Sequence, residues 1–150
     1  MYSITVQRTI PKNTMPPIKQ LKAWALIVLK KQVRKAELTI RVATVTEMAD
    51  LNAQYRGKKG ATNVLSFPLD HIPKQRLFGD IIICAEVVNQ EAIEQEKSLD
   101  AHWAHMVIHG TLHLLGYDHI SDEEAAIMEP LEINFLQTLG FSNPYSLEEG

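Results

Sequence analysis

A helix-forming segment rich in histidine constrains this chain most. Five of its six histidines lie between residues 102 and 119. The segment 99–115 is otherwise mostly apolar, which predicts a helix that is buried on nearly every side. At about 100° per residue, four histidines share one stripe about 80° wide: His102, His105, His109 and His113. Buried imidazole nitrogens need partners, so the stripe predicts a binding site.

The spacing of three histidines is typical of a metal centre. His109 and His113 lie four residues apart, so one helix can direct both rings to a single ion. Gly116 can end the helix in a left-handed conformation, which lets His119 return to the same ion. Three histidines with an open position are typical of catalytic zinc, although imidazole also suits nickel, iron or copper. We therefore predict one zinc ion per chain, held by His109, His113 and His119.

Neighbouring residues have less specific patterns. His105 lies on the stripe and is expected either to support a ligand, to contact substrate, or to pack in the core. Tyr117 and Asp118 lie beside His119 and are expected either to support the ligands or to pack. His102, near the start of the helix, is expected to be exposed.

The segment from His109 to His119 has the ligand and glycine spacing of the metzincin proteases, His-Glu-x-x-His-x-x-Gly-x-x-His. Gly110 stands where those proteases have the glutamate that acts as general base. A metal cradle without this base argues against a peptidase, although another carboxylate can substitute.

Hydrophobic periodicity predicts the rest of the fold. Strands are expected at 3–9, 38–44, 62–67 and 80–85, with a polar loop from Pro68 to Phe78 and the last strand central, because it is apolar on both faces. Helices are expected at 18–31, 46–55 with Thr46 as cap, 86–97, 99–115, and from a capping box at Ser121 to about Gly140 with a kink at Pro130. The prediction is one α+β domain over residues 1–150: a small mixed four-stranded sheet packed with about five helices, the metal site at the end of a buried helix, and a flexible tail at 142–150.

Composition and charge narrow the class of protein. Hydrophobic residues make up 45% and charged residues 22%, which is ordinary for a globular protein. No apolar run is long enough to span a membrane, no signal peptide is visible, and the single cysteine, Cys84, suits a reducing cytoplasm. Residues 1–60 carry 12 Lys and Arg against 3 Asp and Glu, whereas residues 61–150 carry 3 against 15. This division indicates either a polyanionic partner or solvated faces of opposite sign.

The histidine string resembles the signature of the YbeY family, bacterial metal-dependent endoribonucleases of ribosomal RNA maturation. Two further segments match that family: YRGKKGATNVLSFP at 55–68 and Gly79-Asp80-Ile81. Their order and spacing agree over essentially the whole chain. Two residues depart from the family pattern, Asn63 where aspartate is frequent and Pro130 in a helix usually free of proline.

The resemblance implies residue roles and a function. His109, His113 and His119 would bind zinc, and Arg56 would be the essential basic residue that faces the metal across a cleft. Lys58 and Lys59 are then placed to hold flanking phosphates of RNA. The implied protein is a cytoplasmic, single-strand-specific endoribonuclease that matures the 16S 3′ end and acts in ribosome quality control. Its partners would be ribosomal RNA and ribosomal proteins or assembly factors, with no membrane and no nucleotide cofactor.

Chemistry supports this reading but leaves alternatives. Zinc held by imidazoles activates water and acts as a Lewis acid, and the planar fork of Arg56 suits a phosphate. No obvious general base is encoded. Two alternatives remain. One is a metal-carrying ribosome-assembly or RNA-binding factor that does not cleave RNA, and the other is a zinc hydrolase of another substrate.

Overall fold

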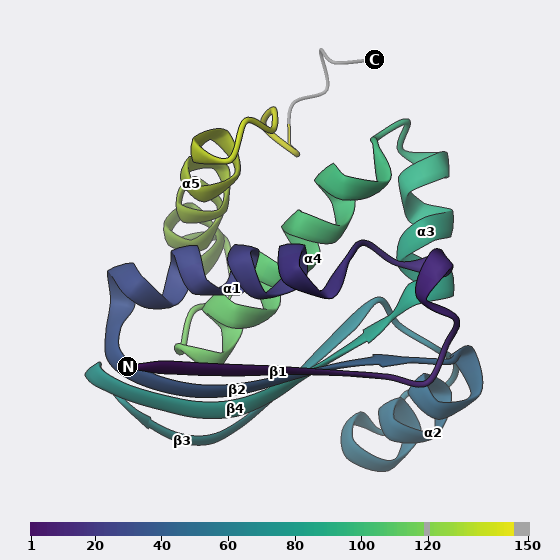
Figure 1. Ribbon diagram of the computed structural model, residues 1–150, viewed down its shortest axis with the longest axis horizontal. Coiled ribbons are helices and arrows are strands. Elements are labelled where there is room, and N and C mark those ends of the chain that lie inside the picture. Colours follow the sequence, from purple (N-terminus) through teal and green to yellow (C-terminus); the bar gives the residue numbers. More distant parts are fainter. Residues whose placement is uncertain (119–120, 146–150) are drawn as a thin grey trace.

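A mixed sheet with strand order β1-β2-β4-β3 forms the base of the molecule. The computed structural model describes residues 1–118 and 121–145 (Figure 1). The sheet contains β1 (Tyr2–Arg8), β2 (Val33–Ala43), β3 (Val64–Ile72) and β4 (Lys74–Cys84). Strands β1, β2 and β4 run parallel, and β3 runs antiparallel to β4. The mixed four-stranded sheet is therefore confirmed.

Helices cover both faces of this sheet. Within the described residues they are α1 (Ile18–Gln32), α2 (Val45–Arg56), α3 (Ala85–Glu94), α4 (Leu99–Leu114) and α5 (Asp122–Thr138), with a 3-10 turn at Lys12–Thr14. Figure 1 shows α1, α4 and α5 above the sheet and α2 below it at the lower right. The predicted α+β class with about five helices is confirmed. None of the helices in the described part of the chain is both long and apolar enough to cross a membrane.

Strand β4 lies between two apolar clusters, as its sequence predicts. Ile81 and Ile83 belong to the main core, which α1 and α4 cover. Ile82 points to the other face, where it joins a smaller cluster with Met48 of α2 and Leu65 of β3. A strand that is apolar on both faces is therefore central in this sheet.

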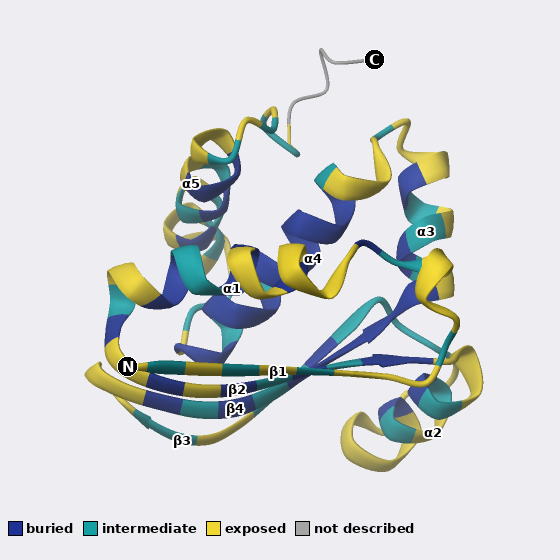
Figure 2. Ribbon diagram, viewed as in Figure 1, coloured by how far each residue is buried: buried dark blue, intermediate teal, exposed yellow. Residues whose placement is uncertain are grey.

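Helix α4 lies at the centre of the helical layer. It contacts β3 and β4 below it and α1, α3 and α5 around it. Figure 2 shows most of its length as buried. The hydroxyl of Ser98 caps its first turn by accepting from the backbone N–H of Ala101. The predicted buried helix is therefore confirmed.

Two glycines let α4 lie close to the sheet. A Cβ on Gly110 would lie 3.1 Å from Cγ2 of Ile81 and 3.3 Å from Cγ2 of Val64. A Cβ on Gly79 of β4 would lie 3.0 Å from Cδ2 of Leu114. The hydroxyl of Ser66 in β3 also donates to the carbonyl oxygen of Gly110, at 3.0 Å. Position 110 therefore faces the sheet, so a side chain there would enter the core.

The predicted polar loop at 68–78 is wrong, because this segment is a β-hairpin. Strand β3 continues through Pro68 to Ile72, and β4 already begins at Lys74, whose φ of 66° makes the turn. The strand register shifts between Pro68 and Asp70, which marks a bulge. Proline is tolerated on an edge strand such as β3, and the exposed end of a hairpin needs no apolar alternation.

Smaller differences concern element ends. Strand β2 begins at Val33, directly after α1, rather than at Leu38. Thr44, not Thr46, caps α2, since its side chain accepts from the backbone N–H of Glu47. The capping box at Ser121 is confirmed, and α5 runs from Asp122 to Thr138 with Pro130 inside it.

The packing of Gly110 gives a first prediction. Gly110→Glu should lower the free energy of unfolding by about 3 kcal/mol or more, because the change forces a carboxylate into a packed apolar interface. Ala23→Glu on the exposed face of α1 is the matched control and should change stability by about 0.5 kcal/mol or less. Urea unfolding of both variants and wild type measures the difference; equal effects would show that position 110 has room for a side chain.

Candidate active site

A cleft of about 810 Å³ opens between the end of α2, strand β3 and helix α4. One wall carries Arg56, and another carries His105, His109 and His113. Other lining residues come from the segment before β3, from β3 itself and from the C-terminal part of the chain: Thr62, Asn63, Leu65, Phe67, Asp118 and Tyr145. Residues predicted from separate motifs are therefore brought together at one cavity.

The four histidines of α4 follow one another along the helix, as the stripe predicts. Their ring centroids are separated by 6.2 Å, 6.2 Å and 5.8 Å in chain order. His105 is buried, whereas His109 and His113 are half-buried at the cleft. The stripe thus passes from the core into the cleft.

The expected exposure of His102 is wrong, since its exposed fraction is 2%. Helix α3 covers it, and Nε2 of His102 lies 2.9 Å from Oε1 of Glu91. Burial lowers the pKa of His102 and outweighs the Glu91 carboxylate, which raises it. His102 is therefore part of the core, where burial favours its neutral form.

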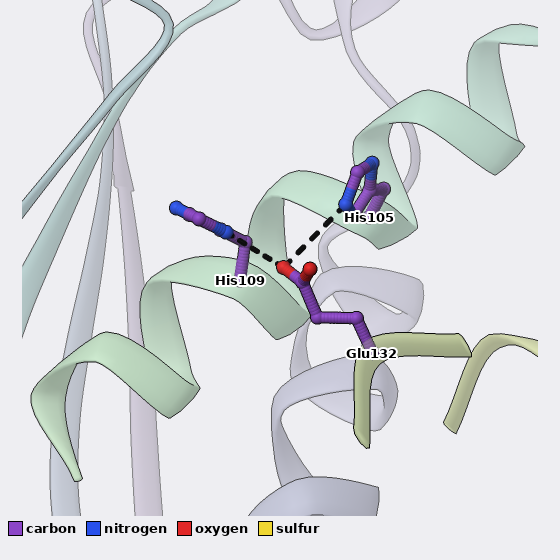
Figure 3. Close-up of side chains that lie close together, drawn as sticks. All are labelled: His105, His109 and Glu132. Atoms are coloured by element: carbon purple, nitrogen blue, oxygen red, sulfur yellow. Dashed lines mark hydrogen bonds and ion pairs between the residues drawn. The ribbon is translucent and has the colours of Figure 1, made fainter. Parts of the chain in front are cut away.

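A buried carboxylate, which sequence reasoning missed, meets the histidines of α4. Oε2 of Glu132 in α5 lies 2.6 Å from Nδ1 of His109 and 3.5 Å from Nε2 of His105 (Figure 3). The hydroxyl of Tyr145 donates to its other oxygen, Oε1. Burial by itself raises the pKa of Glu132, but the hydrogen bonds from His105 and His109 lower it to about 2.

A sequence signal for Glu132 does exist. Met128, Glu132, Phe135 and Leu136 have helical spacing, and all four are buried in α5. An acidic residue within the apolar stripe of a helix indicates a buried charge that needs a partner.

The basic residues of the cleft lie where α2 ends. Arg56 is the last residue of α2, and Gly57 ends the helix with a φ of 65°. Arg56, Lys58 and Lys59 are exposed. The ring of Tyr55 packs edge-on against that of Phe67, with centroids 5.2 Å apart. The helix end thus presents a guanidinium to the cleft, followed by two lysines.

The remaining predicted residues lie at the end of α4. Gly116 has a φ of 99°, so its predicted left-handed conformation is confirmed. Oδ1 of Asp118 lies 3.3 Å from Nε2 of His113. Tyr117 packs against the main core and donates its hydroxyl to Oε1 of Gln32 at 3.1 Å, which favours the packing alternative. His119 lies outside the described residues.

The donor atoms suit a metal ion. One ring nitrogen each of His105 and His109 and a carboxylate oxygen of Glu132 lie within 4.8 Å of one another, so this group can hold a metal. His113 adds a further imidazole, which also lines the cleft and whose ring centroid lies 5.8 Å from that of His109. Nitrogen and carboxylate donors fit zinc and several other divalent ions.

Metal donors on one wall of a cleft and a guanidinium on another are the groups that hydrolysis of phosphate esters uses. The family model described as Endoribonuclease YbeY matches residues 7–140. The chain therefore belongs to the YbeY endoribonuclease family, which supports a role in ribosomal RNA maturation. The chain is also similar to TM1509 from Thermotoga maritima, known from a solution structure. The two share 26% sequence identity with a TM-score of 0.64, over 91% of this chain and 87% of that chain.

The burial of His102 predicts a pH dependence of stability. The unfolded chain takes up a proton at His102 below the ordinary pKa of 6.5, whereas the lowered pKa in the folded chain moves this uptake to lower pH. This residue's contribution to stability is therefore full at higher pH and is lost as the pH falls below 6.5. The test compares the free energy of unfolding of wild type with that of His102→Gln. The difference, wild type minus variant, should become smaller as the pH is lowered from about 7.5 to about 5.5. A difference that stays constant or increases over this range would contradict a neutral, buried His102.

Proposed function

We propose that this chain cleaves single-stranded RNA in the cleft, using a zinc ion held by His109, His113 and His119. The observation that carries the proposal is that Arg56 lines the same cavity as His109 and His113. Family membership supports RNA as the substrate.

Each group has a chemical role in this proposal. A zinc ion, when bound, supplies a Lewis acid and activates water. Arg56 contacts the phosphoryl oxygens through two parallel N–H donors and stabilises the charge that grows on them. Asp118, within 3.3 Å of His113, orients that ring. The protein thereby supplies metal ligands from α4 and charge stabilisation from the end of α2.

Binding of the RNA backbone is assigned to the loop after α2. Lys58 and Lys59 are exposed and follow Arg56 after Gly57, so they can neutralise phosphates next to the one that is cut. The excess of basic residues at 1–60 favours the approach of a polyanion to this part of the chain.

The biological setting is part of the proposal. We assign the chain to cytoplasmic maturation of the 16S 3′ end and to ribosome quality control, with ribosomal proteins or assembly factors as partners. Membership of the YbeY family and the excess of basic residues at 1–60 support this assignment.

Arg56→Ala tests the catalytic assignment. Cleavage of a single-stranded RNA should fall by about 10²–10³-fold, as for loss of one preorganised donor to a developing charge, with little change in RNA affinity. Arg76→Ala is the control, because Arg76 forms only an exposed ion pair with Asp70 in the hairpin. Equal loss of affinity and cleavage in Arg56→Ala would instead support an RNA-binding assembly factor. Chelator-sensitive peptide hydrolysis without RNA cleavage would support a hydrolase of another substrate.

Metal content gives a second test. Purified protein should contain about one zinc per chain, because three imidazoles form a single site. His113→Ala should lose that zinc, and a chelator should stop RNA cleavage by wild type. His71→Ala in the β3–β4 hairpin is the control and should keep the metal. Elemental analysis that finds full zinc retention in His113→Ala would contradict the ligand assignment.

A further inference from the structure

Glu132 is an acid with an exposed fraction of 0%. Both of its carboxylate oxygens have partners. Oε2 lies against Nδ1 of His109, and Oε1 accepts the hydroxyl proton of Tyr145. These contacts join α4, α5 and the C-terminal segment at one buried carboxylate. A buried charge is stable only when it is hydrogen-bonded in this way, so the contacts account for its presence in the core.

The distance between Glu132 and His109 distinguishes two roles for the carboxylate. Two ligands of one tetrahedral zinc, each about 2.0–2.1 Å from the ion, lie about 3.3 Å apart. Oε2 of Glu132 and Nδ1 of His109 are 2.6 Å apart, which is the distance of a short hydrogen bond. This Oε2–Nδ1 pair therefore has the geometry of donor and acceptor. The group of His105, His109 and Glu132 is close enough to hold a metal, but not with these two atoms as simultaneous ligands at this separation.

This contact determines which nitrogen of His109 can bind a metal. A carboxylate only accepts hydrogen bonds, so Nδ1 of His109 carries a proton, and in the neutral ring Nε2 then carries the lone pair. Figure 3 shows the second ring nitrogen of His109 pointing away from Glu132. His109 and His113 both line the cleft, and their ring centroids are 5.8 Å apart.

We infer that Glu132 is a positioning residue: by accepting the Nδ1 proton of His109, it fixes the ring in the tautomer and orientation that present Nε2 to the cleft. Tyr145 holds the carboxylate in place from its other oxygen. The inference rests on the proposed role of His109 as a metal ligand. A carboxylate behind a ligating histidine also makes that imidazole a better donor, and losing such a partner commonly costs 10–100-fold in metal affinity.

The first measurement uses wild type without metal. In the neutral ring, the nitrogen-15 chemical shifts of His109 should show the proton on Nδ1. A proton on Nε2 would overturn the inference. This measurement needs no variant, so it does not depend on how a substitution affects folding.

Two variants then remove the contact in steps. Glu132→Gln keeps a neutral acceptor, and Glu132→Met removes the acceptor while filling a similar volume. Zinc affinity, measured by competition with a chelating dye, should fall by about 10–100-fold in Glu132→Met and by less in Glu132→Gln. Both variants should still bind one zinc per chain at saturation, and the His109 ring should populate both tautomers in Glu132→Met. Affinity within about twofold of wild type in Glu132→Met, or no zinc bound at saturation, would each overturn the positioning role.

A matched control comes from helix α3. Glu91 also meets an α4 histidine, with Oε1 2.9 Å from Nε2 of His102, but His102 lies outside the proposed ligand set. Glu91→Gln should leave the zinc affinity and the His109 tautomer unchanged. An equal loss of zinc affinity in Glu91→Gln and Glu132→Gln would indicate a general structural effect instead.

These measurements also distinguish the positioning role of Glu132 from the proposed function. Suppose that wild type shows the Nδ1 proton, that the two Glu132 variants show the expected zinc affinities, and that wild type cuts no RNA. This result would refute the nuclease function and would leave the positioning role of Glu132 in place.

Discussion

The close packing of α4 on the sheet is the constraint on which the site depends. Gly110 and Gly79 allow this contact, because side chains at those positions would meet Ile81 and Leu114. With its other sides covered by helices and strands, α4 can present polar groups only along one stripe. The histidines occupy that stripe, and the packing thereby fixes where the rings can lie.

Position 110 also explains a difference from the metzincin proteases in structural terms. The glutamate of those proteases must reach the cleft, whereas position 110 in this chain faces Ile81 and Val64. The matching ligand spacing therefore occurs on a helix whose rotation against the sheet leaves no room for a base at that position. Similar spacing of ligands does not imply similar surroundings.

Local sequence patterns predicted those parts of the molecule that local interactions determine. The α4 stripe, the central strand β4, the capping box at Ser121 and the left-handed Gly116 all depend on periodicity or on a short-range steric rule. The hairpin was missed because an exposed edge pair has no apolar alternation. The burial of His102 and the contact of Glu132 with His109 depend on α3 and α5 packing beside α4, which no local pattern encodes.

The edge position of β3 has a consequence for what can approach the cleft. Pro68 has no backbone N–H to donate, and the bulge next to it breaks the regular spacing of the remaining edge groups. An edge interrupted in this way is a poor template for another β-strand. Copies of the chain are thereby discouraged from joining their sheets along this border, which keeps the wall formed by β3 accessible to an extended polymer.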